Sequence, residues 1–599
     1  MTPGIGRSTR KANRTFICPS QSQEVAALGD SIDILTRTAA TSSSSLAAVG
    51  RQKRCPPRFP VIFLCALLCS CAHLVRISYP PEPMIHPAFD QRFTTWDGER
   101  VQVALTPSLR GEPLKYLARY DQVFLANSIR QRGLRHEYKI AGIGTPLVVY
   151  SRNPDITQKE KHYPTSGITL GLTAVKEGRP GQMPILKLYD AFDPAVVKSS
   201  YGPHPIAANY TATLAVLYSH ARKVAESAAA SFFRSDNPRF ATGIYLIHPY
   251  DPNKVPILFI HGLISSPISW QNLTNDLCSD PKILEHYQPW FFLYPTGQPV
   301  LESAAQLRED LQATQRLFDP HGTATASHHV VVIAHSMGGL LAHTLVSDTG
   351  DALWSVFATK PLSSLYLSAN EKELVMKYFF FRHQPAIDRV IFLAVPHRGS
   401  WLAAGIVGSV GNRLIQHSKS PAQAMKELAG KYPGILDPYF ARINARGGPT
   451  SLFWLAPNPL LSRLADLPIQ VPFHSIIGNR GIDEGADSSD GIVAYRSSHL
   501  EGAESEKIVR AGHNLVSNPT TVAEIKRILE ETIVGGSVKA IAVARPIPEV
   551  PPMINTTFLQ MSSYLSGSFT GSGMRLRRRD VLERVQRRGF VEHSESRHI

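Results

Sequence analysis

Cysteine is scarce in most of this chain. Of its six cysteines, five lie before residue 72, and only Cys278 follows them. A single thiol cannot form an internal disulfide, and no CxxC pair stands opposite another in the sequence. The region after residue 72 is therefore neither a disulfide-stabilised secreted scaffold nor a zinc module built on paired cysteines.

Positive charge is also scarce between the two ends. The 599 residues carry a net charge of +15, and segments 1–58 and 574–599 hold ten of these charges. A body that binds nucleic acid needs its positive charge along a folded face. The mildly basic residues in between argue against nucleic acid as a partner.

The N-terminal residues have the composition of a targeting segment. Residues 1–54 are rich in Ser, Thr and Ala without apolar periodicity, and we expect them to be disordered or a wrongly assigned extension. Four basic residues between 51 and 58 precede an apolar run at 60–71, which is too short to span a bilayer comfortably. Residues 55–71 are therefore predicted to be a signal peptide.

The end of this run, Leu68-Cys69-Ser70-Cys71, resembles a bacterial lipobox, in which the last cysteine is acylated. The resemblance implies a lipoprotein attached to a membrane of the bacterial cell envelope, in the periplasm or at the outer membrane. A single-pass signal anchor and ordinary secretion are the alternatives.

The remaining chain divides by composition. Residues 72–95 contain a proline-rich stretch and are expected to be a tether, and 538–599 to be a disordered, Arg-rich tail. Residues 96–235 are predicted to form a smaller mixed α+β accessory region. Its expected strands and helices are 147–150, 168–172 and 185–189, and 115–132 and 209–233 respectively.

Residues 236–537 show a different pattern, in which short apolar runs alternate with helical stretches. Strands that are apolar on both faces indicate a mostly parallel central sheet covered by helices on both sides. The last helix should begin at Pro519, with Asn518 as its N-cap. The expected strands are 244–247, 256–260, 290–294, 330–333, 390–394 and 473–477, and the expected helices include 304–317 and 338–346.

The strongest chemical signal is the run Val330-Val331-Val332-Ile333-Ala334-His335-Ser336-Met337-Gly338-Gly339. A strand leads directly into a sharp turn that carries one serine, and a helix of small residues follows. This is a nucleophile elbow of the G-x-S-x-G kind, with Ala334 in the first small position. Ser336 is therefore the candidate nucleophile.

With this elbow, the region resembles an α/β-hydrolase of the lipase and serine-esterase group, some bacterial members of which carry an AHSMG elbow. A second stretch, Phe259-Ile260-His261-Gly262-Leu263, resembles the HG loop of lipases. The resemblance implies the α/β-hydrolase fold and an oxyanion hole formed by the backbone amides of Leu263 and Met337. His261 is assigned no proton transfer.

In this fold the acid and the base follow the serine in the order Asp or Glu, then His. Asp490 lies in a loop that resembles the acid loop of bacterial lipases, and His513 lies in a loop before the last helix. Asp487 is the second candidate for the acid. His397, in the stretch Pro396-His397-Arg398-Gly399-Ser400, is a rival base, but it precedes Asp490 and is read as structural or pocket-lining.

Two departures limit what the resemblance implies. Related lipases can bind calcium through an Asp two residues after the base, but Leu515 stands there, and no cysteine is present near the acid loop. We therefore expect no metal, no disulfide and no cofactor. Residues 401–470 are either buried core or a cap over the acyl site.

Together these features predict a serine hydrolase that cleaves carboxylic esters, of lipids or other acyl groups, through an acyl-enzyme. A lipid acyltransferase with the same triad and a noncatalytic binding protein of the same fold are the alternatives. The expected partners are an ester or lipid substrate and a membrane, the latter reached through the N-terminal lipid or signal anchor. The sequence does not specify the acyl chain length or the oligomeric state.

Overall fold

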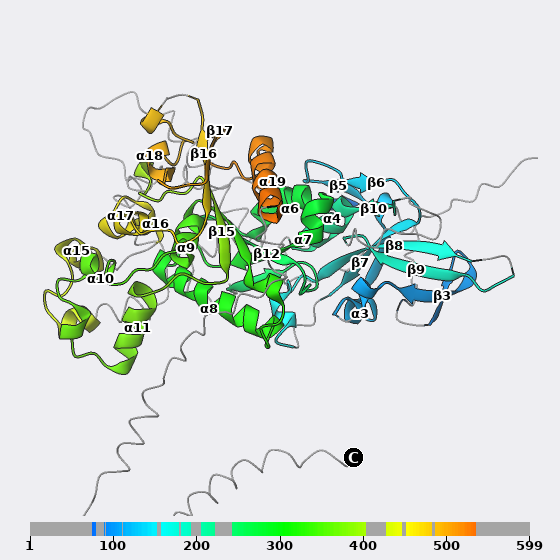
Figure 1. Cartoon of the computed structure of the whole chain (residues 1–599), viewed down its shortest axis with the longest axis horizontal. Helices are drawn as coiled ribbons and strands as arrows, with labels where there is room; N and C mark the ends of the chain where they lie inside the picture. Colours follow the sequence, from blue (N-terminus) through cyan, green and yellow to red (C-terminus); the bar gives the residue numbers. More distant parts are fainter. Residues whose placement is uncertain are drawn as a thin grey trace, which may run out of the picture. The chain divides into compact units, whose positions relative to one another are not determined.

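The computed structural model describes residues 75–78, 89, 92–110, 112–152, 157–178, 181–192, 205–221, 242–402, 427–445, 451–481 and 485–534. The predicted signal peptide, Cys71, the C-terminal tail and much of the suggested cap lie outside these residues. The described residues belong to one compact unit that ends at Val538. They form a seven-stranded sheet and a six-stranded sheet, with two short strand pairs (Figure 1).

The seven-stranded sheet contains all six of the predicted apolar runs. Its neighbours are all parallel except the edge strand β11, which pairs antiparallel with β13. β12 is buried along its whole length, as expected of a strand covered on both faces. In sheet order the strands are β11 (Gly243–Leu246), β13 (Tyr287–Leu293), β12 (Val255–Ile260), β14 (Val330–His335), β15 (Ile387–Leu393), β16 (Phe473–Asn479) and β17 (Ser505–Arg510).

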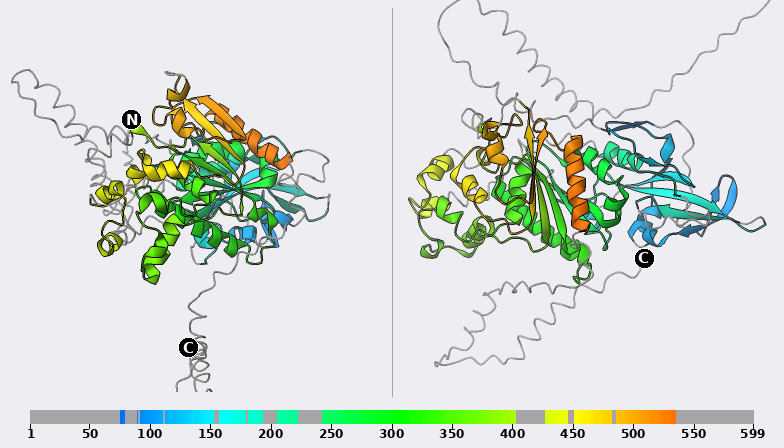
Figure 2. Two further views of the ribbon diagram at one scale, coloured as in Figure 1. Left: turned by 60° about the vertical axis from the view of Figure 1, so that its left-hand side comes forward. Right: turned by 45° about the horizontal axis from the view of Figure 1, so that its top comes forward.

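Helices cover both faces of this sheet (Figure 2). α6 (Gln271–Leu277), α7 (Pro281–His286) and α19 (Pro519–Val534) pack together on one face. α8 (Val300–Phe318) and α9 (Met337–Leu345) pack against each other on the opposite face. This arrangement buries the apolar side chains of the parallel strands on both sides.

The start of α19 follows the sequence prediction. The helix begins at Pro519, whose missing N–H would have had no partner in the first turn. The side-chain oxygen of Asn518 accepts a hydrogen bond from the Thr520 amide at 2.9 Å, which caps the helix. This cap fixes the end of the loop that carries His513.

A group of helices lies beyond the carboxyl ends of β14, β15 and β16, within and around the segment suggested as a cap. Phe453, Trp454 and Leu461 are buried there, so the described part of 401–470 contributes to the apolar core. The helices are α10 (Trp354–Phe357), α11 (Ala369–Phe379), α15 (Pro438–Ala445), α16 (Ser451–Leu455), α17 (Pro459–Ala465) and α18 (Tyr495–Ser498).

The N-terminal region is built on the six-stranded sheet, which contains the three strands predicted from sequence. Its pairs are antiparallel except β3 with β9. Helix α4 (Tyr210–His220) packs against β7 and β8. In sheet order the strands are β2 (Phe93–Trp96), β3 (Glu99–Leu105), β9 (Ile185–Asp190), β8 (Ile168–Glu177), β7 (Thr145–Ser151) and β4 (Gln122–Leu125).

Two sequence expectations differ from the structure here. The helix expected over 115–132 is replaced by α3 (Glu112–Leu117), β4 and β5 (Arg130–Arg132), because the run Gln122–Leu125 pairs with β7 instead of continuing a helix. The segment expected as a tether, 72–95, contains β1 (Arg76–Ser78), which pairs with β5, and all but the last residue of β2, which pairs with β3. Periodicity within a segment gave no sign of strand partners that lie elsewhere in the chain, such as β5 for β1 and β7 for β4.

The N-terminal region packs on the helices of the larger sheet. A buried hydroxyl on α4, that of Thr211, donates to the side chain of Asn275 on α6 at 3.0 Å. The Tyr138 hydroxyl donates to Asp276 at 2.7 Å, and Arg135 donates to the backbone oxygen of Ser517. One continuous apolar core includes side chains from both sheets.

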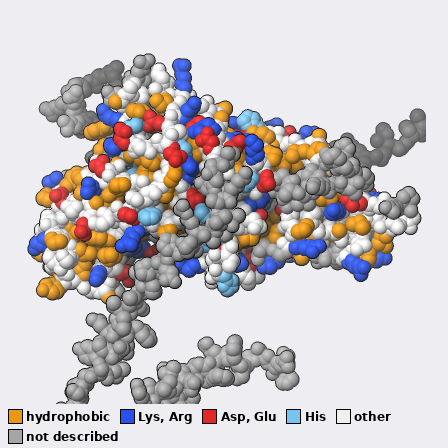
Figure 3. Space-filling model, in the orientation of Figure 1, with side chains coloured by type: hydrophobic (Ala, Val, Ile, Leu, Met, Phe, Trp, Pro, Cys, Tyr) orange, Lys and Arg blue, Asp and Glu red, His pale blue; other side chains and the backbone are white. Residues whose placement is uncertain are grey.

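Charges of both signs are interspersed on the face shown in Figure 3, without a continuous basic surface there. No helix in the described part of the chain combines the length and apolarity needed to cross a bilayer.

Candidate active site

Ser336 lies at the sharp turn between β14 and α9. Its backbone has φ +54° and ψ −126°, a conformation that L-residues rarely adopt and that lifts the side chain away from both elements. Its amide donates to the oxygen of Leu393 at 2.9 Å, which ties the turn to β15.

The glycines after Ser336 are required by close packing. A Cβ on Gly338 would lie 2.4 Å from the backbone oxygen of Ile260, and one on Gly339 would lie 2.1 Å from the side chain of Val395. Real Cβ atoms do not approach other atoms so closely. Small residues after the serine therefore allow α9 to start directly against the sheet.

His513 connects Ser336 to Asp490. Its Nε2 lies 2.9 Å from the Ser336 Oγ, and its Nδ1 lies 2.7 Å from the Asp490 Oδ2. A carboxylate only accepts hydrogen bonds, so Nδ1 carries the proton and Nε2 accepts from the serine hydroxyl. All three residues are buried. They come from the loops after β14, β16 and β17, because parallel strands end at one edge of the sheet.

Asp490 is held in its ionised form. Burial alone would raise the pKa of this carboxyl, but the neighbouring His513 and hydrogen bonds to the carboxylate give it a net pKa below the usual value. The Oδ1 atom accepts from the amides of Ile492 and Val493 at 2.8 and 2.7 Å. The other oxygen is thereby left to orient His513.

The second candidate acid, Asp487, and the rival base, His397, do not form part of the series Ser336–His513–Asp490. Asp487 ends the short helix Gly485–Asp487, whereas the carboxylate that meets His513 is that of Asp490. The Nδ1 of His397 lies 3.3 Å from that of His343, on α9, and burial lowers the pKa of His397 well below its ordinary value. His397 thus faces a buried histidine rather than Ser336.

The HG loop lies against Ser336. A Cβ on Gly262 would be 3.0 Å from the Cβ of Ser336, so this glycine allows the loop after β12 to approach the serine. Leu263 follows it, and Met337 is the first residue of α9, where an amide has no partner within the helix. Among the described residues, no hydrogen bond occupies the amide of Leu263 or Met337.

The stretch around His397 supports the acid loop, a role that the sequence did not reveal. The Ser400 hydroxyl donates to the oxygen of Ile492 at 2.6 Å, and the Ser497 hydroxyl donates to that of Gly399 at 2.6 Å. These bonds fix the segment that presents Asp490. The sequence feature that could have indicated this role is the position of the stretch directly after the strand β15, at the edge of the sheet where the site lies.

His335 is a second residue whose position only the structure reveals. Its Nε2 donates to the backbone oxygen of His513 at 2.9 Å. Burial and the neighbouring His513 lower the pKa of His335 to about 3, so its imidazole is neutral at ordinary pH. The residue before Ser336 therefore holds the loop that carries His513.

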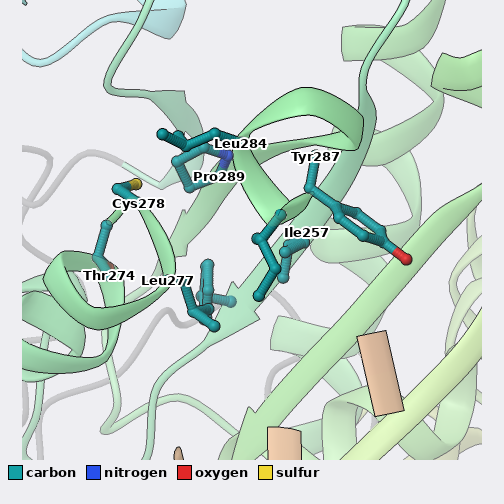
Figure 4. A pocket seen from close by; sticks show the side chains of 9 residues that line it. Ile257, Thr274, Leu277, Cys278, Leu284, Tyr287 and Pro289 are labelled. Atoms are coloured by element: carbon teal, nitrogen blue, oxygen red, sulfur yellow. The ribbon is translucent and has the colours of Figure 1, made fainter. Parts of the chain in front are cut away.

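Within the described ranges, no group of three or more His, Cys, Asp or Glu side chains is placed to hold a metal ion. A small apolar cavity of about 20 Å³ lies between α6, α7 and the strands β12 and β13, beside Cys278 (Figure 4). Its lining includes none of the residues Ser336, Asp490 and His513.

Comparison with protein families gives a match within the larger region. Residues 257–525, less than half of the chain, match the family described as "Alpha/beta hydrolase family". This region has the α/β-hydrolase fold. The fold class predicted from sequence is confirmed, and the family match supports a hydrolase in general terms.

Solved structures similar to the chain include a mature lipase of Bacillus licheniformis, at 19% identity over 49% of this chain and 99% of that chain, with a TM-score of 0.27. A lipase-esterase related protein from Clostridium acetobutylicum is 15% identical over 47% of this chain and 98% of its own, with a TM-score of 0.24. A thioesterase domain from the curacin biosynthetic pathway is 15% identical over 48% and 99% of the two chains, with a TM-score of 0.26. No curated protein sequence matches the chain.

Proposed function

We propose that the protein is a serine hydrolase that cleaves carboxylic esters through an acyl-enzyme. The observation that carries this proposal is the hydrogen-bonded series Ser336–His513–Asp490, which ends at a strained serine. Beside it lie the amides of Leu263 and Met337, to which no described residue forms a hydrogen bond. Each group is buried and held by backbone contacts, as preorganised catalysis requires.

In the proposed reaction, the Ser336 oxygen attacks the ester carbonyl while His513 takes the hydroxyl proton. Asp490 holds the imidazole and stabilises its charged form. The amides of Leu263 and Met337 donate to the oxyanion, and the N-terminal end of α9 favours the same negative charge. His513 then protonates the leaving alcohol, and water attacks the acyl-enzyme with His513 as base.

Replacement of the nucleophile tests this proposal. We expect Ser336→Ala to abolish both ester turnover and labelling by a fluorophosphonate probe, because no other group takes the place of the attacking oxygen. Turnover is measured across p-nitrophenyl esters and emulsified triglycerides, and folding by circular dichroism. Ser347→Ala is the matched control, since Ser347 is also buried and close in sequence, but its hydroxyl forms no hydrogen bond with any described residue. Labelling of a different serine in Ser336→Ala would contradict the assignment.

An acyltransferase would use the same residues but pass the acyl group to a lipid alcohol. Product analysis with added alcohol acceptors separates the two reactions. A noncatalytic binding protein would show neither turnover nor probe labelling, and the hydrogen-bonded triad argues against it.

We also propose attachment to a bacterial envelope membrane through an acylated Cys71. The support is the sequence pattern alone, since this residue lies outside the described part of the chain. In a bacterial host, Cys71→Ser should leave unprocessed precursor and remove labelling by a radioactive fatty acid, with Cys69→Ser as the control. If Cys71→Ser is processed and acylated as the wild type is, the lipoprotein proposal is wrong. A signal anchor or ordinary secretion would then be the remaining alternatives.

A further inference from the structure

The loop that follows β13 contacts the HG loop at two places. β13 and β12 are parallel neighbours, so the segments that follow them leave the sheet side by side. Tyr294 and Thr296 belong to the segment after β13, and both side chains are completely or almost completely buried, with exposures of 1% and 0%. Neither was singled out by a sequence motif.

The two hydroxyl groups hold two peptide groups of the HG loop that are separated by one other peptide group. Tyr294 donates to the backbone oxygen of His261 at 2.7 Å, and its ring stacks on the imidazole of His261 with centroids 4.5 Å apart. Thr296 accepts from the amide of Ile264 at 3.1 Å. The peptide group between these two contacts is the one that carries the Leu263 amide.

The backbone at the second of these contacts, Ile264, is under strain. Ile264 has φ +51°, a left-handed conformation that is costly for a β-branched side chain. Such a conformation persists only where surrounding contacts determine it. The buried bond from the Ile264 amide to Thr296 is such a contact, and it would be lost if the loop relaxed to an ordinary conformation.

We infer that Tyr294 and Thr296 are positioning residues that orient the Leu263 amide toward the oxyanion. This inference rests on the proposed ester hydrolysis, in which that amide is one of two oxyanion donors. Neither side chain contacts the reacting atoms. They act through the loop backbone, so their contribution appears when negative charge develops on the substrate oxygen.

The experiment compares kcat and KM for an oxygen ester with those for the matching thionoester in Thr296→Val and Thr296→Ser. Loss of a whole oxyanion donor costs about 10²–10³ in kcat, so a misoriented donor should cost roughly tenfold. We expect this loss in kcat of Thr296→Val for the oxygen ester, with little change in KM. Sulfur accepts hydrogen bonds weakly, so the thionoester rate should change much less. Thr296→Ser keeps the hydroxyl and should restore most of the rate.

Tyr294→Phe should give the same selective loss, and the chain offers matched controls. Tyr287, at the opposite end of β13, is also buried and donates its hydroxyl to a backbone oxygen, that of Leu529, at 3.0 Å. Thr274 is a buried threonine on α6 bonded to the oxygen of Trp270 at 2.9 Å. Both controls line the small cavity of Figure 4, and the hydroxyl bonds given above go to Leu529 and Trp270 rather than to the HG loop. Tyr287→Phe and Thr274→Val should leave the ratio of the two rates unchanged.

The outcomes separate this inference from the proposed function. If the wild type neither turns over esters nor reacts with the fluorophosphonate probe, the proposed function fails, and the inference fails with it. Suppose instead that the wild type is active and that Thr296→Val is folded. If this variant keeps the wild-type kcat for the oxygen ester, or loses the oxygen-ester and thionoester rates equally, the positioning role is wrong while ester hydrolysis stands.

Discussion

At the scale of single residues, the site depends on how Asp490 is held. One oxygen meets His513 and the other accepts two backbone amides, so the carboxylate is both oriented and ionised. Neighbouring charge and hydrogen bonds outweigh the effect of burial on its pKa. The carboxylate is thereby suited to keeping His513 in the tautomer that accepts from Ser336.

Asp490→Asn should therefore lower kcat by about 10⁴-fold, because an amide in this place favours the wrong tautomer of His513. The measurement is turnover of a p-nitrophenyl ester at pH 8, with fluorophosphonate labelling as a second readout. Asp487→Asn, the change at the second candidate acid, should keep most of the activity. Equal losses in the two variants would show that the acid is misassigned.

At the scale of elements, the junction of β14 with α9 sets the geometry of Ser336, the proposed nucleophile. The helix starts so close to β12 that the backbone oxygens of Ile260 and His261 lie within 2.5 Å of where a Cβ on Gly338 would be. Backbone atoms cannot move aside as the end of a flexible side chain can. The turn and the neighbouring strand must therefore shift together if this space is filled.

Gly338→Ala should destabilise the protein by about 1–3 kcal/mol, the usual cost of overpacking, and should reduce activity by displacing Ser336. Urea unfolding and ester turnover are the measurements. Gly430 is the control, because it is also helical and nothing lies within 4 Å of its added Cβ. Gly430→Ala should be neutral or slightly stabilising. Wild-type stability and activity in Gly338→Ala would contradict the close approach.

At the scale of the whole molecule, the folded chain buries many neutral histidines. Burial is the largest cause of the lowered pKa in each of seven described histidines, with values of about 4 for His261, His343 and others. An imidazole of this kind takes up a proton on unfolding when the pH lies between its folded and unfolded pKa values. The seven are His162, His248, His261, His335, His343, His397 and His474.

The free energy of unfolding should therefore be highest above pH 6.5 and should fall as the pH drops from about 6.5 toward 4. Each histidine that takes up a proton on unfolding contributes a slope of up to about 1.4 kcal/mol per pH unit. Urea unfolding at a series of pH values measures this slope. His343→Gln should reduce it, whereas the same change at the exposed His321 should not. A flat profile between pH 6.5 and 4.5 would contradict the burial of neutral histidines.

The sequence by itself determined the local features of this protein. Apolar runs such as 256–260 and 330–333 predicted the strands of the larger sheet, because a strand covered on both faces is mostly apolar. Asn518 and Pro519 marked the start of α19, because a cap acts on its own first turn. The elbow around Ser336 could be recognised for the same reason, since its requirements lie within a few residues.

Only the tertiary structure decided which distant groups meet. The strand partners of β1 and β4 lie outside the local segments from which predictions were made. The sequence therefore predicted a tether where β1 is found and a helix where β4 is found. The sequence predicted Asp490 as the acid from its position between Ser336 and His513 and from the resemblance of its loop. Its contact with His513 depends on the loops after β16 and β17, which meet at one edge of the sheet. The positions of His335, Tyr294 and Thr296 depend likewise on neighbouring parallel strands. Local sequence patterns specify how each segment folds, whereas contacts between segments are set by the packing of the whole sheet.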